Sequence, residues 1–276
     1  MNKILSRGKP LCFFGRIFLL WMIIFFSAGT AFCQNEIAVN IKSLDKIRGD
    51  KIYLDPQGNL YVIQDALLHK YNGRGDFLYS YSNFSLGNIT TADVTNPMKI
   101  MLYYQETNTI LFLDERLAPI TDKIDLFTKR YTTISMAAYT TDNQIWLYDY
   151  AGMDLVILDL YLNPVARVHY NFPDFHPTQM FEIPGKNVIM HNPGKGVYFF
   201  DSFGTYIKTV GIQSKNDIQI IDNIIYYLKD GQLHRYNFKE LSEEIIPLKI
   251  KDPMQCLRYK GRLFILDING KVYIYG

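Results

Sequence analysis

The chain has 276 residues and a formal net charge of +2, and its 21 tyrosines and 18 phenylalanines favour β-strands. A nearly neutral chain without a clustered basic face offers no electrostatic reason to expect nucleic-acid binding. Cys12 and Cys33 fall in the N-terminal region, which leaves Cys256 alone. An internal disulfide is therefore excluded, and the fold must depend on its apolar core.

Residues 1–33 are typical of a secretory signal peptide. Basic residues precede an unbroken apolar run over 17–26, and small residues follow it. We expect cleavage after Cys33, which leaves residues 34–276 as a single domain. The protein is therefore predicted to be exported.

Three other outcomes stay open at the N-terminus. Cleavage after Ala31 also satisfies the small-residue rule. Lipidation of Cys33 is disfavoured because Phe32, directly before it, is bulky. Retention as an anchor is disfavoured because the apolar stretch is shorter than the ~20 residues of a membrane span. We expect no stable transmembrane span after cleavage.

A repeat of 36 to 45 residues runs through the rest of the chain. Each unit contains an apolar strand, a polar or glycine-containing turn and a second apolar strand, and five of the six end on Asp or Asn. Such turns supply the positive φ that a tight hairpin requires. The six predicted hairpins cover residues 59–72, 99–114, 144–159, 187–201, 223–237 and 262–276.

Further short strands flank these hairpins, for example at 134–139 and 217–222 before them and at 76–82 and 165–171 after them. Four strands in about 40 residues is the composition of a propeller blade. The sequence therefore predicts an all-β, six-bladed β-propeller with four-stranded antiparallel blades. The last unit lacks a fourth strand, and we expect the N-terminal strand 36–44 to supply it and close the ring.

No catalytic or cofactor motif is present. There is no Gly-x-Ser-x-Gly elbow, Gly-x-Gly-x-x-Gly sequence or Walker loop. The histidines lack the spacing of a zinc site, and His69 and His234 occupy the same position in two repeats. Cys256 is expected to be a small buried apolar residue, and residues 55–58 a β-turn rather than a calcium loop. No metal and no cofactor is predicted.

One polar residue per unit is predicted to face the central channel, on the innermost strand of each blade. Such a ring of short polar side chains suits a small ligand, an ion or a loop of a partner, although any propeller channel is wet and therefore polar. The predicted channel residues are Asp50, Asp93, Ser135, Gln179, Gln219 and Gln255.

The connection 90–97 is a second predicted binding element, with Thr95 and Asn96 at its centre. It contains turn-forming residues and few apolar anchors, and loops are where a rigid scaffold carries function. The turn 192–196 is a weaker candidate, because turn chemistry alone explains it.

The string ADVTNPMKIMLYYQETNTILFLDERL (92–117), together with QIWLYD and HNPGKGVYFFD, resembles a family of exported six-bladed β-propellers of Bacteroidota. More distantly, the repeat resembles NHL and WD40 propellers, which serve mostly as binding platforms. The resemblance implies a periplasmic or outer-membrane-associated protein of the cell envelope. It implies no activity, and fold alone does not decide function.

The sequence favours a non-catalytic binding or scaffold propeller whose partner is another envelope protein or a small ligand. The main alternative is a metal-dependent hydrolase, lactonase or lyase with its site in the channel, where Asp50, Asp93, Gln179 and Gln219 would supply the ligands. Gln is a weak neutral ligand, which argues against tight metal binding. A carbohydrate binder that uses exposed tyrosines is a third possibility.

Overall fold

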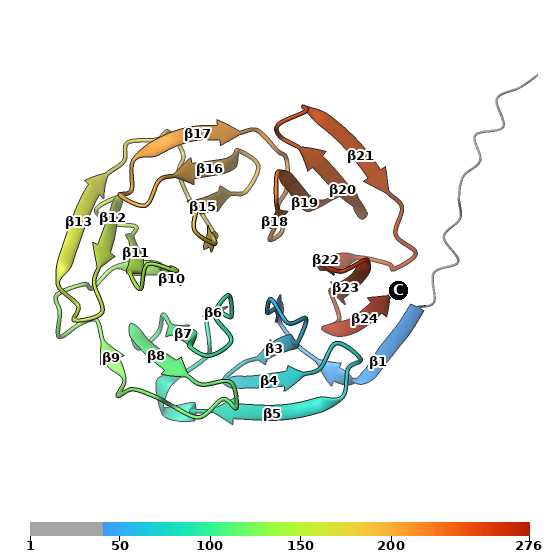
Figure 1. Ribbon diagram of the computed structural model, residues 1–276, viewed down its shortest axis with the longest axis horizontal. Coiled ribbons are helices and arrows are strands. Elements are labelled where there is room, and N and C mark those ends of the chain that lie inside the picture. The colour runs from blue at the N-terminus through green and yellow to red at the C-terminus, as the bar shows by residue number, and fades with distance from the viewer. Residues whose placement is uncertain (1–40) are drawn as a thin grey trace, which may run out of the picture. The chain divides into compact units, whose positions relative to one another are not determined.

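Residues 41–276, which the computed structural model describes, form a closed ring of six antiparallel four-stranded sheets (Figure 1). Each sheet is one blade, and its strands follow one another from the centre of the ring to the rim. The predicted six-bladed β-propeller is therefore confirmed. The predicted signal peptide and the domain boundary at Gln34 lie outside the described residues.

The first three blades follow directly along the chain. Blade 1 contains β2 (Lys51–Leu54), β3 (Leu60–Gln64), β4 (Leu67–Tyr71) and β5 (Phe77–Ser82). A short 3-10 helix, η1 (Phe84–Leu86), connects it to blade 2. Blade 2 contains β6 (Thr91–Asp93), β7 (Ile100–Tyr104), β8 (Thr109–Leu113) and β9 (Ile124–Asp125). Blade 3 contains β10 (Ile134–Tyr139), β11 (Ile145–Asp149), β12 (Asp154–Leu158) and β13 (Pro164–His169).

The other three blades complete the ring. Blade 4 contains β14 (Gln179–Ile183), β15 (Asn187–Asn192), β16 (Gly196–Phe200) and β17 (Tyr206–Val210). Blade 5 contains β18 (Gln219–Ile221), β19 (Ile224–Lys229), β20 (Gln232–Asn237) and β21 (Ser242–Ile246). Blade 6 contains β22 (Pro253–Tyr259), β23 (Arg262–Asp267) and β24 (Lys271–Tyr275), with β1 (Ile41–Arg48) at its rim.

The N-terminal strand β1 closes the ring as the fourth strand of blade 6, as the short last repeat predicts. It pairs with β24 in antiparallel register, with Leu44 opposite Val272. The strand continues to Arg48, four residues beyond its predicted end, because Leu44 and Ile47 are both buried in the core between blades 6 and 1. Residues 36–40 of the predicted strand lie outside the described residues.

Apolar packing between neighbouring blades forms the core. The second and third strands of blade 2 are buried at every position, because each face of the sheet contacts another blade. Trp146 and Phe200, for example, join blades 3 and 4, and Phe112 and Tyr139 join blades 2 and 3. Burial on both faces explains why these strands read as continuous apolar runs rather than as alternating ones.

The Asp or Asn that ends a repeat holds the turn between the third and fourth strands. Asp159 Oδ1 accepts the main-chain N–H groups of the residues two and four positions later, at 2.9 and 2.8 Å. Asn72, Asp114 and Asp201 make the same pair of hydrogen bonds in blades 1, 2 and 4. Asp55 does so in the turn after β2, which confirms that residues 55–58 are a turn. A side chain that replaces a main-chain acceptor in this way is a known turn-forming device.

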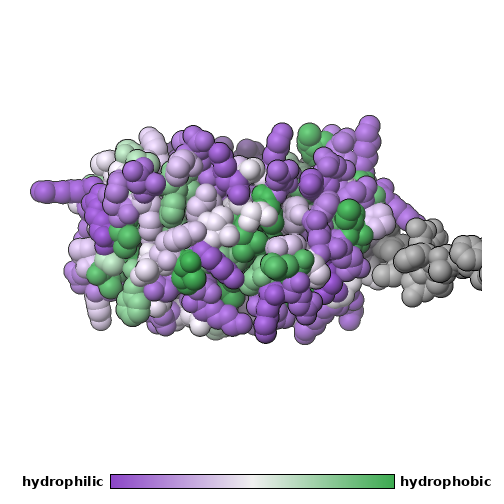
Figure 2. Space-filling view, turned by 90° about the horizontal axis from the view of Figure 1, so that it is seen from above, coloured by the Kyte–Doolittle hydropathy of each residue, from purple (hydrophilic) through white to green (hydrophobic). Residues whose placement is uncertain are grey.

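The outer strands protect the rim. Figure 2 looks onto this rim, where hydrophobic side chains lie among hydrophilic ones. The pairing of β5, β13 and β17 with their inner neighbours skips one residue in each case, at Leu78, Val165 and Ile207. Such a bulge interrupts the regular row of unpaired edge groups and so opposes edge-to-edge association.

Candidate functional site in the central channel

A cavity of about 220 Å³ lies in the central channel. The first strand of every blade contributes to its wall, so residues separated by up to 206 positions meet there. Figure 1 shows these inner strands arranged around the centre of the ring. A cavity shared by all blades can exist only when the ring is closed.

The structure brings five of the eight predicted binding residues to this cavity, and the binding role itself stays a prediction. Those on the wall are Asp93, Thr95, Gln179, Gln219 and Gln255. The other three are engaged elsewhere. Asp50 is exposed and accepts the N–H of Asp65 at 2.9 Å, the Ser135 hydroxyl points to Tyr148 O at 3.5 Å, and Asn96 accepts the N–H of Met98 at 3.0 Å.

The glutamine side chains of the channel join neighbouring blades. Gln255 Oε1 accepts the N–H of Ile52 at 2.8 Å, and Gln255 Nε2 donates to Ile52 O at 2.9 Å. One side-chain amide thus pairs with both polar groups of one residue in the next blade. We call this arrangement an amide clamp, and here it joins blade 6 to blade 1.

Two further amide clamps join blade 4 to blade 5 and blade 5 to blade 6. Gln179 exchanges hydrogen bonds of 2.9 and 3.0 Å with the main chain of Ile218. Gln219 exchanges bonds of 2.7 and 3.1 Å with the main chain of Arg258. The sequence predicts that both glutamines face the channel. The structure adds that their amides join neighbouring blades and so hold the channel wall together.

Carboxylates play a related part at two other junctions. Asp93 Oδ2 accepts the N–H of Tyr139 in blade 3 at 3.1 Å, while its Oδ1 accepts the N–H and hydroxyl of Thr95. Glu182 of blade 4 accepts the N–H of Thr141 in blade 3 at 2.7 Å and its hydroxyl at 2.9 Å. Burial raises the pKa of both carboxyl groups, and these hydrogen bonds oppose that rise.

The predicted connection 90–97 is wrong as a loop in its first half, where the inner-strand position predicted for Asp93 holds instead, and the binding role of Thr95 and Asn96 stays a prediction. Thr91–Asp93 is β6, the innermost strand of blade 2, paired with β7. Strand pairing decides this outcome, because a three-residue strand leaves almost no periodic signal in the sequence. Only the second half of the segment is a turn, and Asp93 organises it.

Sequence reasoning missed Lys51, Tyr53 and Asp217 on the cavity wall. Burial raises the pKa of the Asp217 carboxyl group, and the positive charge of Lys51 opposes this rise. Burial and then Asp217 raise the pKa of Tyr53. The signal was available: Asp217 precedes Gln219 by two residues, and alternate residues of a strand share a face.

The donor set suggested for a channel metal does not fit. Asp50 is not on the cavity wall, and the Oε1 atoms of Gln179 and Gln219 already accept main-chain N–H groups. Within residues 41–276, no three side chains among His, Cys, Asp and Glu come together in a way that would hold a metal ion.

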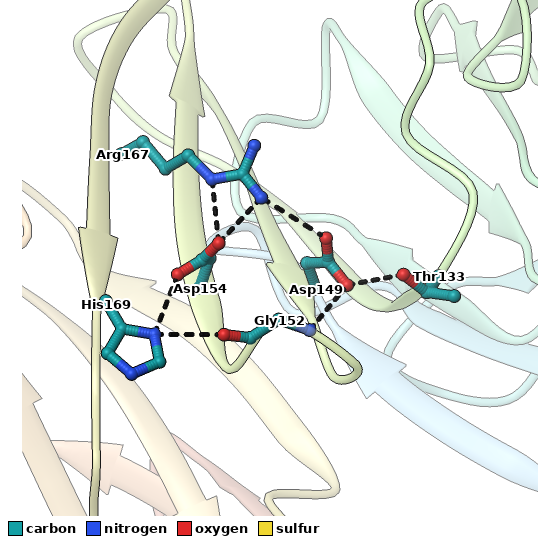
Figure 3. Close-up of polar contacts among 6 residues, drawn as sticks. All are labelled: Thr133, Asp149, Gly152, Asp154, Arg167 and His169. Carbon is teal, nitrogen blue, oxygen red and sulfur yellow. Dashed lines mark hydrogen bonds and ion pairs between the residues drawn. The ribbon is translucent and has the colours of Figure 1, made fainter.

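A second polar cluster lies outside the channel, at the turn between β11 and β12 in blade 3 (Figure 3). Arg167 donates to Asp154 Oδ2 through Nε at 2.7 Å and Nη2 at 2.6 Å, and its Nη2 lies 3.7 Å from Asp149 Oδ2. Thr133 donates to the other oxygen of Asp149. The guanidinium thus balances two carboxylates whose side chains are mostly buried, which stabilises the turn.

His169 completes this cluster on the same outer strand (Figure 3). Its Nδ1 lies 3.1 Å from Asp154 Oδ1 and 3.0 Å from Gly152 O. Both neighbours are acceptors, so Nδ1 carries the hydrogen and Nε2 is left as an acceptor in the neutral ring. The side chains of the cluster are bonded to one another and to the turn, and we assign it a structural role.

No protein-family model and no curated protein matches this sequence. Solved structures do match it in fold. A streptogramin B lyase superposes with a TM-score of 0.63 at 10% identity, over 86% of this chain and 97% of that chain. The Pan2 WD40 domain of Neurospora crassa gives a TM-score of 0.57 at 8% identity, over 83% and 89%.

The N-terminal part of BBS1 (BBS1N), solved in complex with ARL6DN, gives a TM-score of 0.53 at 15% identity, over 79% of this chain and 74% of that chain. At these identities the likeness extends to the fold alone. The matched proteins include a lyase and a propeller bound to another protein, and one architecture therefore serves both chemistry and binding.

We predict that Gln255→Ala lowers the free energy of unfolding by about 2–3 kcal/mol. It removes two hydrogen bonds and leaves the polar main-chain groups of buried Ile52 unpaired. Urea unfolding measures the change, and Gln213→Ala is the control, because Gln213 is exposed and makes no side-chain hydrogen bond in the described part of the chain. Equal, small losses in both variants would show that the clamp contributes nothing to stability.

We predict that His191 makes the free energy of unfolding depend on pH. This residue of β15 is 0% exposed. Burial lowers its pKa to about 4, and neither ring nitrogen has a hydrogen-bond partner among the described residues. Between pH 6.5 and 4 the unfolded chain therefore binds a proton that the folded protein does not. The free energy of unfolding consequently decreases as the pH is lowered through this range. We expect this residue to account for about 2–3 kcal/mol of the loss between pH 7.5 and 4.5.

The measurement compares urea unfolding of the wild type and of His191→Leu at both pH values. Titrating carboxylates contribute equally to both proteins, so the difference between their pH-dependent losses isolates His191. Parallel losses in the two proteins would contradict the prediction.

Proposed function

We propose that this chain is a non-catalytic binding propeller of the bacterial cell envelope, which accepts a small ligand or a loop of a partner protein in its central channel. The observation that carries the proposal is the cavity to which all six blades contribute. Its wall is held by amide clamps and by the bonds of Asp93 and Glu182, so the site exists before any ligand arrives. A preformed concave site reduces the ordering cost of binding.

The side chains of the wall favour binding over chemistry. The polar groups in the best position to act, Asp93, Glu182 and the glutamines, already accept hydrogen bonds from neighbouring main chain. Cys256 of β22 is buried, and burial raises the pKa of its thiol to about 12, so it is not a reactive thiolate. Much of the remaining wall is apolar, with Lys51 and Asp217 as its charged exceptions.

The envelope location rests on the sequence. The basic, apolar and small-residue order of residues 1–33 supports export, and the resemblance to exported propellers supports a periplasmic or outer-membrane-associated protein. Within residues 41–276, no helix has the length and hydropathy that a membrane-spanning helix needs.

The proposal predicts position-specific cross-linking in the native envelope. A photoreactive benzoyl-phenylalanine is placed at Thr95, on the cavity wall, or at Glu240, which is exposed on a turn of blade 5. We expect an adduct of defined mass from position 95 and none from position 240. Intact-mass measurement distinguishes a small ligand from a partner protein. The same adducts at positions 95 and 240 would show that binding does not occur in the channel.

Metal analysis of the purified protein distinguishes this proposal from a metal-dependent hydrolase or lyase. We expect no stoichiometric divalent ion, and the same melting temperature with and without chelator. A bound ion together with a lower melting temperature after chelation would overturn the non-catalytic proposal. Hydrolase and lactonase assays would then follow, with Asp93→Asn as the first variant.

A further inference from the structure

A polar crevice of about 140 Å³ lies between blades 3 and 4, next to the channel cavity, and Glu182 lines both. Turns between the first and second strands of both blades line it, together with the turn between the third and fourth strands of blade 4. Trp146 forms part of its apolar wall. The polar side chains on its lining are Thr140, Asp142, Gln144, Glu182, Lys186, Asn187 and Ser202.

Three of these side chains have unused hydrogen-bonding capacity. Asp142, Lys186 and Ser202 make no side-chain hydrogen bond or ion pair with any residue in 41–276, although they line one small space. Together they offer a carboxylate acceptor, an ammonium donor and a hydroxyl that does both. Glu182, in contrast, is bound to Thr141, so it is not available to a ligand.

Phe203 stands in a turn that lines this crevice, and Tyr161 occupies the equivalent turn of blade 3, where the adjoining Leu162 packs between blades 2 and 3. Tyr161 is 84% exposed in the turn after β12, and Phe203, directly after Ser202, is 74% exposed in the turn after β16. Each lies two residues after an Asp that accepts its main-chain N–H, Asp159 for Tyr161 and Asp201 for Phe203. The two aromatic residues therefore hold the same position in neighbouring blades. In an antiparallel four-stranded blade the first and third connections lie at the same end of the strands, which places both turns on the crevice side of the ring.

The corresponding turns of blades 1 and 2 carry Arg74 and Arg116 at this position instead. An isolated exposed apolar side chain needs no explanation. Here Phe203 stands directly after Ser202 of the crevice, and the two other turns that line the crevice supply hydrogen-bonding groups. This combination of stacking surfaces and mixed donors and acceptors is the pattern that we interpret.

We propose that the crevice and the adjacent Phe203 bind a short saccharide. Each sugar hydroxyl can both donate and accept a hydrogen bond. One saccharide can therefore donate to the carboxylate of Asp142, accept from the ammonium of Lys186, and do either with the hydroxyl of Ser202. Asp142 and Lys186 carry opposite charges, which gives a neutral ligand an advantage over an anion or a cation. The C–H faces of sugar rings pack on exposed aromatic side chains, and Phe203 provides such a surface beside Ser202 at the crevice.

Trp146 gives a direct readout of this site. The chain has two tryptophans, and in a full-length Trp21→Phe variant Trp146 is the only one. Maltotriose, cellotriose, xylotriose and chitotriose are titrated separately while tryptophan emission is recorded, and saturation-transfer NMR of each sugar checks for direct contact. We expect at least one trisaccharide to shift the emission and to receive saturation from the protein.

Substitutions locate the binding site. In the same background, Phe203→Ala is expected to weaken binding about tenfold, and Asp142→Ala to weaken it by a similar factor. The matched controls are Leu241→Ala and Glu240→Ala, which change an exposed apolar and an exposed acidic residue in the turn after β20 of blade 5. Both should bind as the parent does.

Two results would overturn the proposal. In the first, no trisaccharide changes the emission of Trp146 or receives saturation from the protein. In the second, a sugar binds equally well to the parent, Phe203→Ala and Asp142→Ala, which would place it elsewhere. Because the crevice does not include Thr95, either result leaves the test of the channel unaffected.

Discussion

The closed ring depends on hydrogen bonds that cross from the inner strand of one blade to that of the next. Three glutamines do this with both atoms of their amide, and Asp93 and Glu182 do it with carboxylate oxygens. Apolar packing between blades is strong but has no direction. Hydrogen bonds between one side chain and one main-chain residue define the relative height and rotation of the blades near the axis.

The clamps also determine what the channel can do. An amide that is bonded to a neighbouring blade has one lone pair and one N–H left, and the clamp fixes their direction. The chemistry of the cavity is therefore left to the side chains outside the clamps, of which Asp217 and Lys51 carry charge. This constraint gives the channel a firmly held wall with few free charged groups, and the side chains that vary between blades lie in the turns.

The turns separate structural from variable positions within each repeat. An Asp or Asn holds the turn after the third strand in blades 1 to 4, while the tip of that turn is arginine in two blades and aromatic in the other two. The capping residue must remain because it satisfies main-chain N–H groups. The tip is free to vary because it contacts solvent, so adjacent blades can present different surfaces on one scaffold.

The sequence by itself determined the number of blades, the hairpin in each, and the closure by the N-terminal strand. All three follow from local features: a repeated spacing, turn residues at its ends and an incomplete last unit. It also placed Asp93, Gln179, Gln219 and Gln255 near the channel, because alternation along a strand is a local property. The signal peptide predicted over residues 1–33 lies outside the described residues, and export stays a prediction.

Only the tertiary structure decided what those side chains contact. Gln255 bonds to Ile52, 203 positions away, and no local pattern shows which main-chain groups a closed ring leaves unpaired. For the same reason the sequence did not predict that these amides join neighbouring blades, extended the connection at 90–97 over β6, and missed Asp217 and the crevice between blades 3 and 4. Each of these features depends on how blades stand beside one another, and that arrangement exists only after long-range packing has closed the ring.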